Sequence, residues 1–189
     1  MSVNYAKGDA TAPGGSGAKI IAHVCNDSGY FAKGFVSALA AKYPQAQAEY
    51  LVAFPKGHWQ MDKLGTVQFV TINPDIVIAN MIAQRGIKPC EDYTPRGCPP
   101  IRYPALFKCL KVVADFARSK KAEVVGPRFG AGLSGGDWDV IEALIEKAMP
   151  DIKVTIYDLP VAAPAIVSQV ATATSAQVAS SAGDAFGVQ

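Results

Sequence analysis

Apolar and polar positions alternate along the chain in blocks that predict strands and helices in turn. Short apolar runs predict strands over residues 3–6, 19–24, 66–72, 76–81, 122–125 and 153–159. Longer segments with apolar residues at helical spacing predict helices over residues 34–43, 45–54, 103–119 and 137–149, and Pro44 separates the first two. Strands and helices that interleave in this way predict an α/β fold with a three-layer α/β/α arrangement.

A glycine-rich loop follows the strand predicted over residues 122–125. Residues 127–138 read Pro-Arg-Phe-Gly-Ala-Gly-Leu-Ser-Gly-Gly-Asp-Trp and lead into the last predicted helix. Glycines let backbone amides approach an anion closely, and the unpaired amides of a first helical turn add positive potential. The segment is therefore a candidate phosphate loop. A turn that needs glycine only for its backbone angles is the alternative.

Other polar residues fall at the same positions relative to predicted strands. A second loop with glycines, residues 25–34, follows the strand over residues 19–24 and also leads into a helix. Ligands of open α/β sheets collect beyond the carboxyl ends of the strands. Asp9, Asn26, Arg128 and Leu159 all lie at or just beyond such ends. We therefore expect them at one edge of the sheet.

The composition favours one globular domain with an appended tail. Half of the 189 residues are apolar and the net charge is only +2, which gives no strong signal for nucleic-acid binding. The first residues lack the features of a signal peptide, and no apolar run approaches the roughly 20 residues that cross a bilayer, so we expect a cytoplasmic protein without membrane contact. Residues 160–189 contain no Lys or Arg and only one acidic residue, Asp184. This composition predicts a flexible, low-complexity tail after a domain spanning residues 1–159.

The cysteines give no metal-binding pattern. Cys25, Cys90, Cys98 and Cys109 form no C-x-x-C pair, and the chain has only two histidines. We expect reduced thiols, no bound metal and no cofactor. The alternative for Cys90 and Cys98, which flank a Pro/Gly-rich loop, is that they approach each other.

Taken together, the two glycine-bearing loops and the early Gly8-Asp9 pair resemble the macrodomain family, whose members bind ADP-ribose. The resemblance runs from about Tyr5 to Leu159 and is strongest over residues 126–138 and 154–159. It is closest to the branch of terminal ADP-ribose glycohydrolases, antitoxins that remove ADP-ribose from DNA, and ADP-ribose 1''-phosphate phosphatases. It implies an α/β/α macrodomain with a mixed central sheet, whose partner is ADP-ribose or an ADP-ribosylated substrate.

The resemblance also implies a role for each matching position. Asp9 would accept the adenine amino group, Ala10 would lie beside the base, and Leu159 would pack near it. Asn26 would lie beside the distal ribose. The loop that would enclose the diphosphate and distal ribose consists of Arg128, Phe129, Gly130, Ala131, Gly132, Leu133 and Ser134.

Several of these residues have a structural alternative. Asp9 and Asn26 are residue types that often stabilise turns. Phe129 is the kind of aromatic residue that fills a core beside glycines, and Arg128 can extend into solvent. His23 lies within a predicted strand, where a core histidine is the first expectation, and Asp137 is expected to cap the last helix.

The chain departs from the glycohydrolase pattern at two positions. Those enzymes use a lysine and an aspartate, but the aspartate position is Ser134 here. The segment expected to hold the lysine reads Ile82-Ala83-Gln84-Arg85-Gly86, with Lys88 displaced. Losing such a general base removes a contribution of about 10² to 10⁴ in rate.

Three functions therefore remain open. The first is hydrolysis of an ADP-ribose derivative, such as ADP-ribose 1''-phosphate or an ADP-ribosyl ester or adduct, through a water positioned by Asn26 and Asp27. The second is a reader that binds ADP-ribose without chemistry. The third is an unrelated nucleotide-binding domain.

Overall fold

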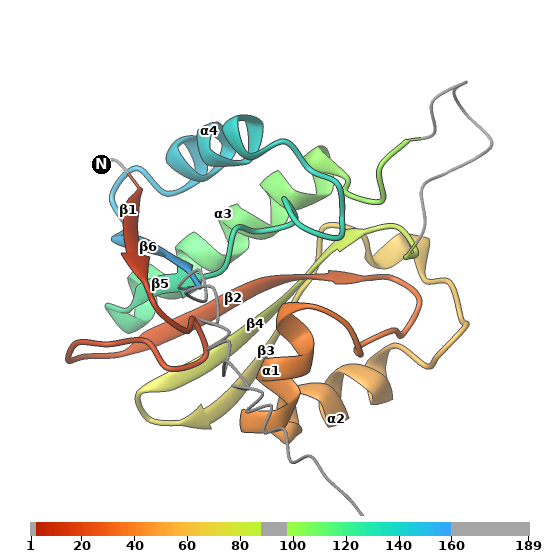
Figure 1. Ribbon diagram of the computed structural model, residues 1–189, viewed down its shortest axis with the longest axis horizontal. Coiled ribbons are helices and arrows are strands. Elements are labelled where there is room, and N and C mark those ends of the chain that lie inside the picture. Colours follow the sequence, from red (N-terminus) through yellow and green to blue (C-terminus); the bar gives the residue numbers. More distant parts are fainter. Residues whose placement is uncertain (1–2, 88–97, 160–189) are drawn as a thin grey trace, which may run out of the picture.

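The computed structural model describes residues 3–87 and 98–159 (Figure 1). Its elements are β1 (Asn4–Lys7), β2 (Lys19–Asn26), α1 (Phe35–Lys42), α2 (Pro44–Ala53), the 3-10 turn η1 (Met61–Lys63), β3 (Val67–Asn73), β4 (Ile76–Gln84), α3 (Tyr103–Lys120), β5 (Glu123–Gly126), α4 (Trp138–Ala148) and β6 (Val154–Asp158). Every strand and helix expected from the sequence is confirmed, with β2 and β4 extending further than expected. Cys90, Lys88 and the tail over residues 160–189 lie outside the described residues.

The strands form one mixed sheet in the order β1-β6-β5-β2-β4-β3. All neighbours pair in parallel except β3 and β4, which are antiparallel. Helices α1 and α2 cover one face of the sheet, and α3 and α4 cover the other (Figure 1). The three-layer α/β/α fold with a mixed sheet is therefore confirmed.

The element boundaries follow from local chemistry. Pro44 begins α2, where a missing N–H costs nothing because the first amides of a helix have no partner. The N-cap role expected for Asp137 is confirmed, since its side chain accepts the N–H of Asp139 at the start of α4. Within the described residues, no helix is both long and apolar enough to cross a membrane.

A buried polar pair lies in the core between the sheet and α2. His23 on β2 is 2 % exposed, and its Nε2 lies 2.6 Å from Oδ1 of Asn80 on β4. The imidazole also packs edge-on against the Phe31 ring. Burial lowers the pKa of His23 from 6.5 to about 4. These contacts favour the core interpretation of this histidine.

The His23 pKa predicts how the stability of the protein depends on pH. Because the folded-state pKa lies below the unfolded value, the contribution of neutral His23 is fully present above pH 6.5. It is lost as the pH falls toward 4, by about 3 kcal/mol in total. We expect His23→Gln to flatten the pH dependence of the free energy of unfolding in this window, as measured by urea denaturation. His58→Gln, at an exposed histidine, is the control, and a wild-type slope in His23→Gln would contradict the assignment.

Candidate functional site

The parallel strands bring five chain segments to one edge of the sheet. The carboxyl ends of β1, β6, β5, β2 and β4 lie there in that spatial order. The segments that follow them carry Asp9, Leu159, the glycine loop of residues 127–137, the loop of residues 27–34, and residues 85–87. Figure 1 shows the glycine loop running from β5 to α4. The expected convergence of the candidate residues at one edge is thus observed.

The glycine loop is folded by hydrogen bonds within itself. The Ala131 N–H donates to the Arg128 carbonyl at 3.2 Å, and the Gly136 N–H donates to the Gly130 carbonyl at 2.9 Å. Gly130 has a φ of 72°, which favours glycine at this position. These bonds fix the curvature of the loop, and most of its backbone N–H groups take no part in them.

Several amides of this loop have no acceptor. Within the described residues, no hydrogen bond uses the backbone N–H of Gly130, Gly132, Leu133 or Ser134. The space in front of Gly132 is open, since a Cβ placed there would meet no atom within 4 Å. Unpaired amides grouped on one loop form a concavity with positive potential that suits an anion.

The amino end of α1 faces this loop. Gly34, the N-cap of α1, has a φ of 75° and gives the first turn no side-chain cap. A Cβ on Gly34 would lie 3.2 Å from Cδ1 of Leu133, whose side chain is 75 % exposed. The first amides of α1 therefore open toward the side of the molecule where the glycine loop lies, and both contribute positive potential there.

Where the edge is formed by β1 and β6, the exposed carboxylate of Asp9 lies beside the strands. Oδ1 of Asp9 accepts the Thr11 N–H and Oδ2 accepts the Thr11 hydroxyl, both at 2.8 Å. Asp9 thus stabilises a turn, yet it is exposed and its carboxylate has further lone pairs to offer. Ala10 is buried and Leu159 is 74 % exposed.

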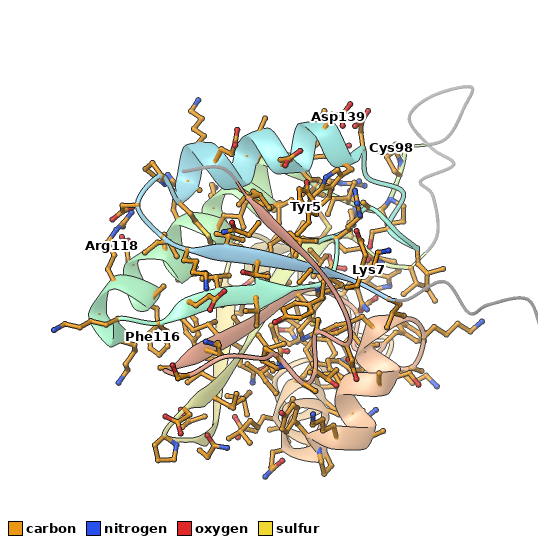
Figure 2. The ribbon with its side chains drawn as sticks, turned by 60° about the vertical axis from the view of Figure 1, so that its left-hand side comes forward. Tyr5, Lys7, Cys98, Phe116, Arg118 and Asp139 are labelled. Atoms are coloured by element: carbon orange, nitrogen blue, oxygen red, sulfur yellow. The ribbon has the colours of Figure 1, made fainter. Side chains whose placement is uncertain are left out.

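Arg128 fastens the glycine loop to its surroundings. Its guanidinium makes two hydrogen bonds to the Asp158 carboxylate, at 2.8 and 2.9 Å, which lower the pKa of Asp158. It also lies 5.3 Å from the Tyr5 ring and 5.0 Å from the Trp138 ring. Figure 2 shows Tyr5 on β1 in the region below α4. These contacts favour a structural role over a charge clamp on a ligand.

Phe129 is fully buried. Its ring occupies the space directly over Gly126, where a Cβ would collide with it. This position favours the core alternative for Phe129, which anchors the start of the glycine loop to the end of β5.

Asn26 is engaged in shaping its own loop. Its Oδ1 accepts the N–H groups of Ser28 and Tyr30 and the Tyr50 hydroxyl, at 3.0 to 3.1 Å. Its Nδ2 donates to the Tyr30 carbonyl at 2.6 Å, and the side chain is only 6 % exposed. The turn-forming alternative is therefore favoured for Asn26.

Asp27 joins the loop after β2 to the loop after β4. It has no exposed surface, and its Oδ1 accepts the Gly86 N–H at 2.8 Å. Its own N–H donates to the Gln84 carbonyl at 3.0 Å. Oδ2 is buried and has no hydrogen-bond partner within the described residues.

Gln84 is a site residue that the sequence reasoning did not select. Its Oε1 accepts the hydroxyl hydrogen of Ser134, and its Nε2 donates to the Gly86 carbonyl at 2.6 Å. The position lies where the resemblance led us to look for a lysine. Its pairing with Ser134, fifty residues later in the chain, has no signal in the sequence.

Comparisons with known proteins agree with this architecture, although no protein-family model matches the chain. A solved protein of Bacteroides thetaiotaomicron is 44 % identical, with a TM-score of 0.75 over 84 % of this chain and all of that one. A macrodomain protein of Streptomyces coelicolor is 41 % identical, with a TM-score of 0.67 over 83 % of this chain and 99 % of that one. An uncharacterised 17.5 kDa protein of phage T4 is 28 % identical over 163 residues, which cover 84 % of this chain and 97 % of the phage protein.

A more distant likeness concerns the fold alone. Thermosipho africanus DarTG, solved in complex with ADP-ribose, is 17 % identical with a TM-score of 0.56, over 75 % of this chain and 38 % of that one. The mixed sheet, its two helical layers and the loops at its carboxyl edge define a macrodomain fold. The identity to the Streptomyces protein over nearly its whole length shows that this chain belongs to the macrodomain family.

Proposed function

We propose that this protein binds ADP-ribose along the carboxyl edge of its sheet. The observation that carries the proposal is the group of unpaired amides at Gly130, Gly132, Leu133 and Ser134, beside the amino end of α1. Such amides stabilise a diphosphate without needing a charged side chain. Family membership and the ADP-ribose complex of DarTG, a protein of the same fold, support the choice of ligand.

The order of the segments along the edge suits the parts of this ligand. Asp9, Ala10 and Leu159 would hold the adenine at β1 and β6, where the Asp9 carboxylate accepts from the exocyclic amine. The glycine loop at β5 would hold the diphosphate, and the distal ribose would lie toward β2 and β4. Four strand intervals separate β1 from β4, or about 19 Å, which leaves room for an extended dinucleotide-like molecule.

The binding proposal is tested by placing a carboxylate in the glycine loop. We expect Gly132→Glu to weaken ADP-ribose binding at least 100-fold, measured by calorimetric titration, because the new charge repels the diphosphate. The open space at Gly132 means that the fold tolerates the side chain. Ser119→Glu is the control, since Ser119 is exposed near the end of α3, which leads into the amino end of β5 at the opposite edge of the sheet. Micromolar affinity retained by Gly132→Glu would contradict the proposed site.

Hydrolysis of an ADP-ribose derivative is a second candidate function, and the Asp27 side chain favours it. A buried carboxylate oxygen without a hydrogen bond is costly, so Oδ2 of Asp27 favours a water or a substrate hydroxyl as its partner. Asp27 would take a proton from a water held there, and the water oxygen would bond to the phosphorus of ADP-ribose 1''-phosphate or to the electrophilic carbon of an ADP-ribosyl ester or adduct. The bond from that atom to its leaving group would break, and the leaving group would take the proton from Asp27. Asn26 would act by holding the loop that carries Asp27. The alternative is a reader module, which binds ADP-ribose without turnover.

Two substitutions of Asp27 separate these roles. Asp27→Asn keeps an acceptor for the Gly86 N–H but removes the base, so we expect ADP-ribose affinity within about threefold of wild type and turnover reduced about 100-fold or more. Asp27→Ala also removes the Gly86 contact and is expected to weaken both binding and turnover. Product analysis with ADP-ribose 1''-phosphate and an ADP-ribosylated peptide is the measurement. Full turnover in Asp27→Asn would rule out Asp27 as the base, and a wild type that binds but forms no product is a reader.

A further inference from the structure

The backbone of the glycine loop and the Ser134 side chain are held by different contacts. The Gly136 N–H donates to the Gly130 carbonyl within the loop. The Ile101 N–H donates to the Ser134 carbonyl, while the Ser134 hydroxyl donates to Gln84. The hydroxyl of Ser134 can therefore be perturbed while the backbone bonds of the loop remain.

Gln84 stands at the centre of a continuous chain of hydrogen bonds. Ser134 donates to Gln84, Gln84 donates to the Gly86 carbonyl, and the Gly86 N–H donates to Asp27. The chain connects the glycine loop after β5, the end of β4 and the loop after β2. The Gln84 side chain makes the link between the glycine loop and the end of β4, and the Asp27 side chain makes the link to the loop after β2.

The geometry points to Gln84 as a positioning residue that sets selectivity for ADP-ribose over ADP. This inference rests on the proposed function. Gln84 must accept from one neighbour and donate to the other, which fixes both the orientation of its amide and the position of Ser134. Ser134 lies at the end of the loop nearest β4, where the distal ribose would bind. ADP has no distal ribose, so its affinity depends on the backbone amides of the loop and not on the Ser134 hydroxyl.

The residue types explain why an amide is suited to this position. Glutamate would still accept the Ser134 hydroxyl, but its second oxygen would face the Gly86 carbonyl oxygen, so two acceptors would repel each other. Alanine would leave the Ser134 hydroxyl and the Gly86 carbonyl without partners. Both changes disturb the position of the Ser134 hydroxyl and leave the backbone bonds of the loop intact.

The test is a titration of each variant with ADP-ribose and with ADP. We expect Gln84→Ala and Gln84→Glu to weaken ADP-ribose binding about tenfold while ADP affinity stays within about twofold, as expected for the loss of one or two hydrogen bonds. Ser134→Ala should produce the same split. The double variant Gln84→Ala with Ser134→Ala should bind ADP-ribose as tightly as the single variant with the lower affinity, because both changes break the same hydrogen bond.

Gln68 offers a matched control. It is also half-buried, and its amide donates to the Glu49 carbonyl and accepts from Asn80, but it lies on β3. We expect Gln68→Ala to leave both affinities unchanged. Equal loss of ADP and ADP-ribose binding in Gln84→Ala, or no loss of either, would overturn the inference while leaving the proposed function standing. A wild type that binds neither nucleotide would overturn the proposed function, and this inference with it.

Discussion

Parallel pairing of β2 with β4 and β5 is the constraint on which the rest of the site depends. In a parallel pair both strands end at the same edge, so the residues that follow them meet there whatever their separation along the chain. This pairing brings Asn26 opposite Gln84 and places the glycine loop beside both. The apolar layers on the two faces, one under α1 and α2 and one under α3 and α4, hold the strands in this arrangement.

Within that frame, the side chains near the edge mainly hold the backbone in place. Arg128 is bonded to Asp158, Phe129 fills the core, and Asn26 closes a turn. Among the described residues of the glycine loop, the groups left without partners are backbone amides. Every residue except proline supplies such an amide, but a fixed loop is needed to direct several of them toward one ligand. This division explains how a site for an anionic ligand is built without a free cation in its glycine loop.

The strands, the helices and the edge of the sheet were all predictable from the sequence, because apolar periodicity and glycine placement are local signals. The extra length of β2 and β4 was not, since their last residues, Asn26 and Gln84, are polar. The roles of single side chains were the hardest to predict. Asn26 is fixed by Tyr50, Arg128 by Asp158 and Ser134 by Gln84, and each of these partners is distant in the chain. A sequence shows the residue types, but it does not show which distant residue completes the hydrogen bonds of each side chain.

The central claim is that backbone amides of the glycine loop bind the diphosphate. The most direct measurement is a ¹⁵N-edited NMR titration of the assigned protein with ADP-ribose. We expect the amide signals of Gly130, Gly132, Leu133 and Ser134 to shift most strongly, together with those of the first turn of α1. Saturable binding that leaves these signals unchanged and moves amides elsewhere in the molecule would contradict it.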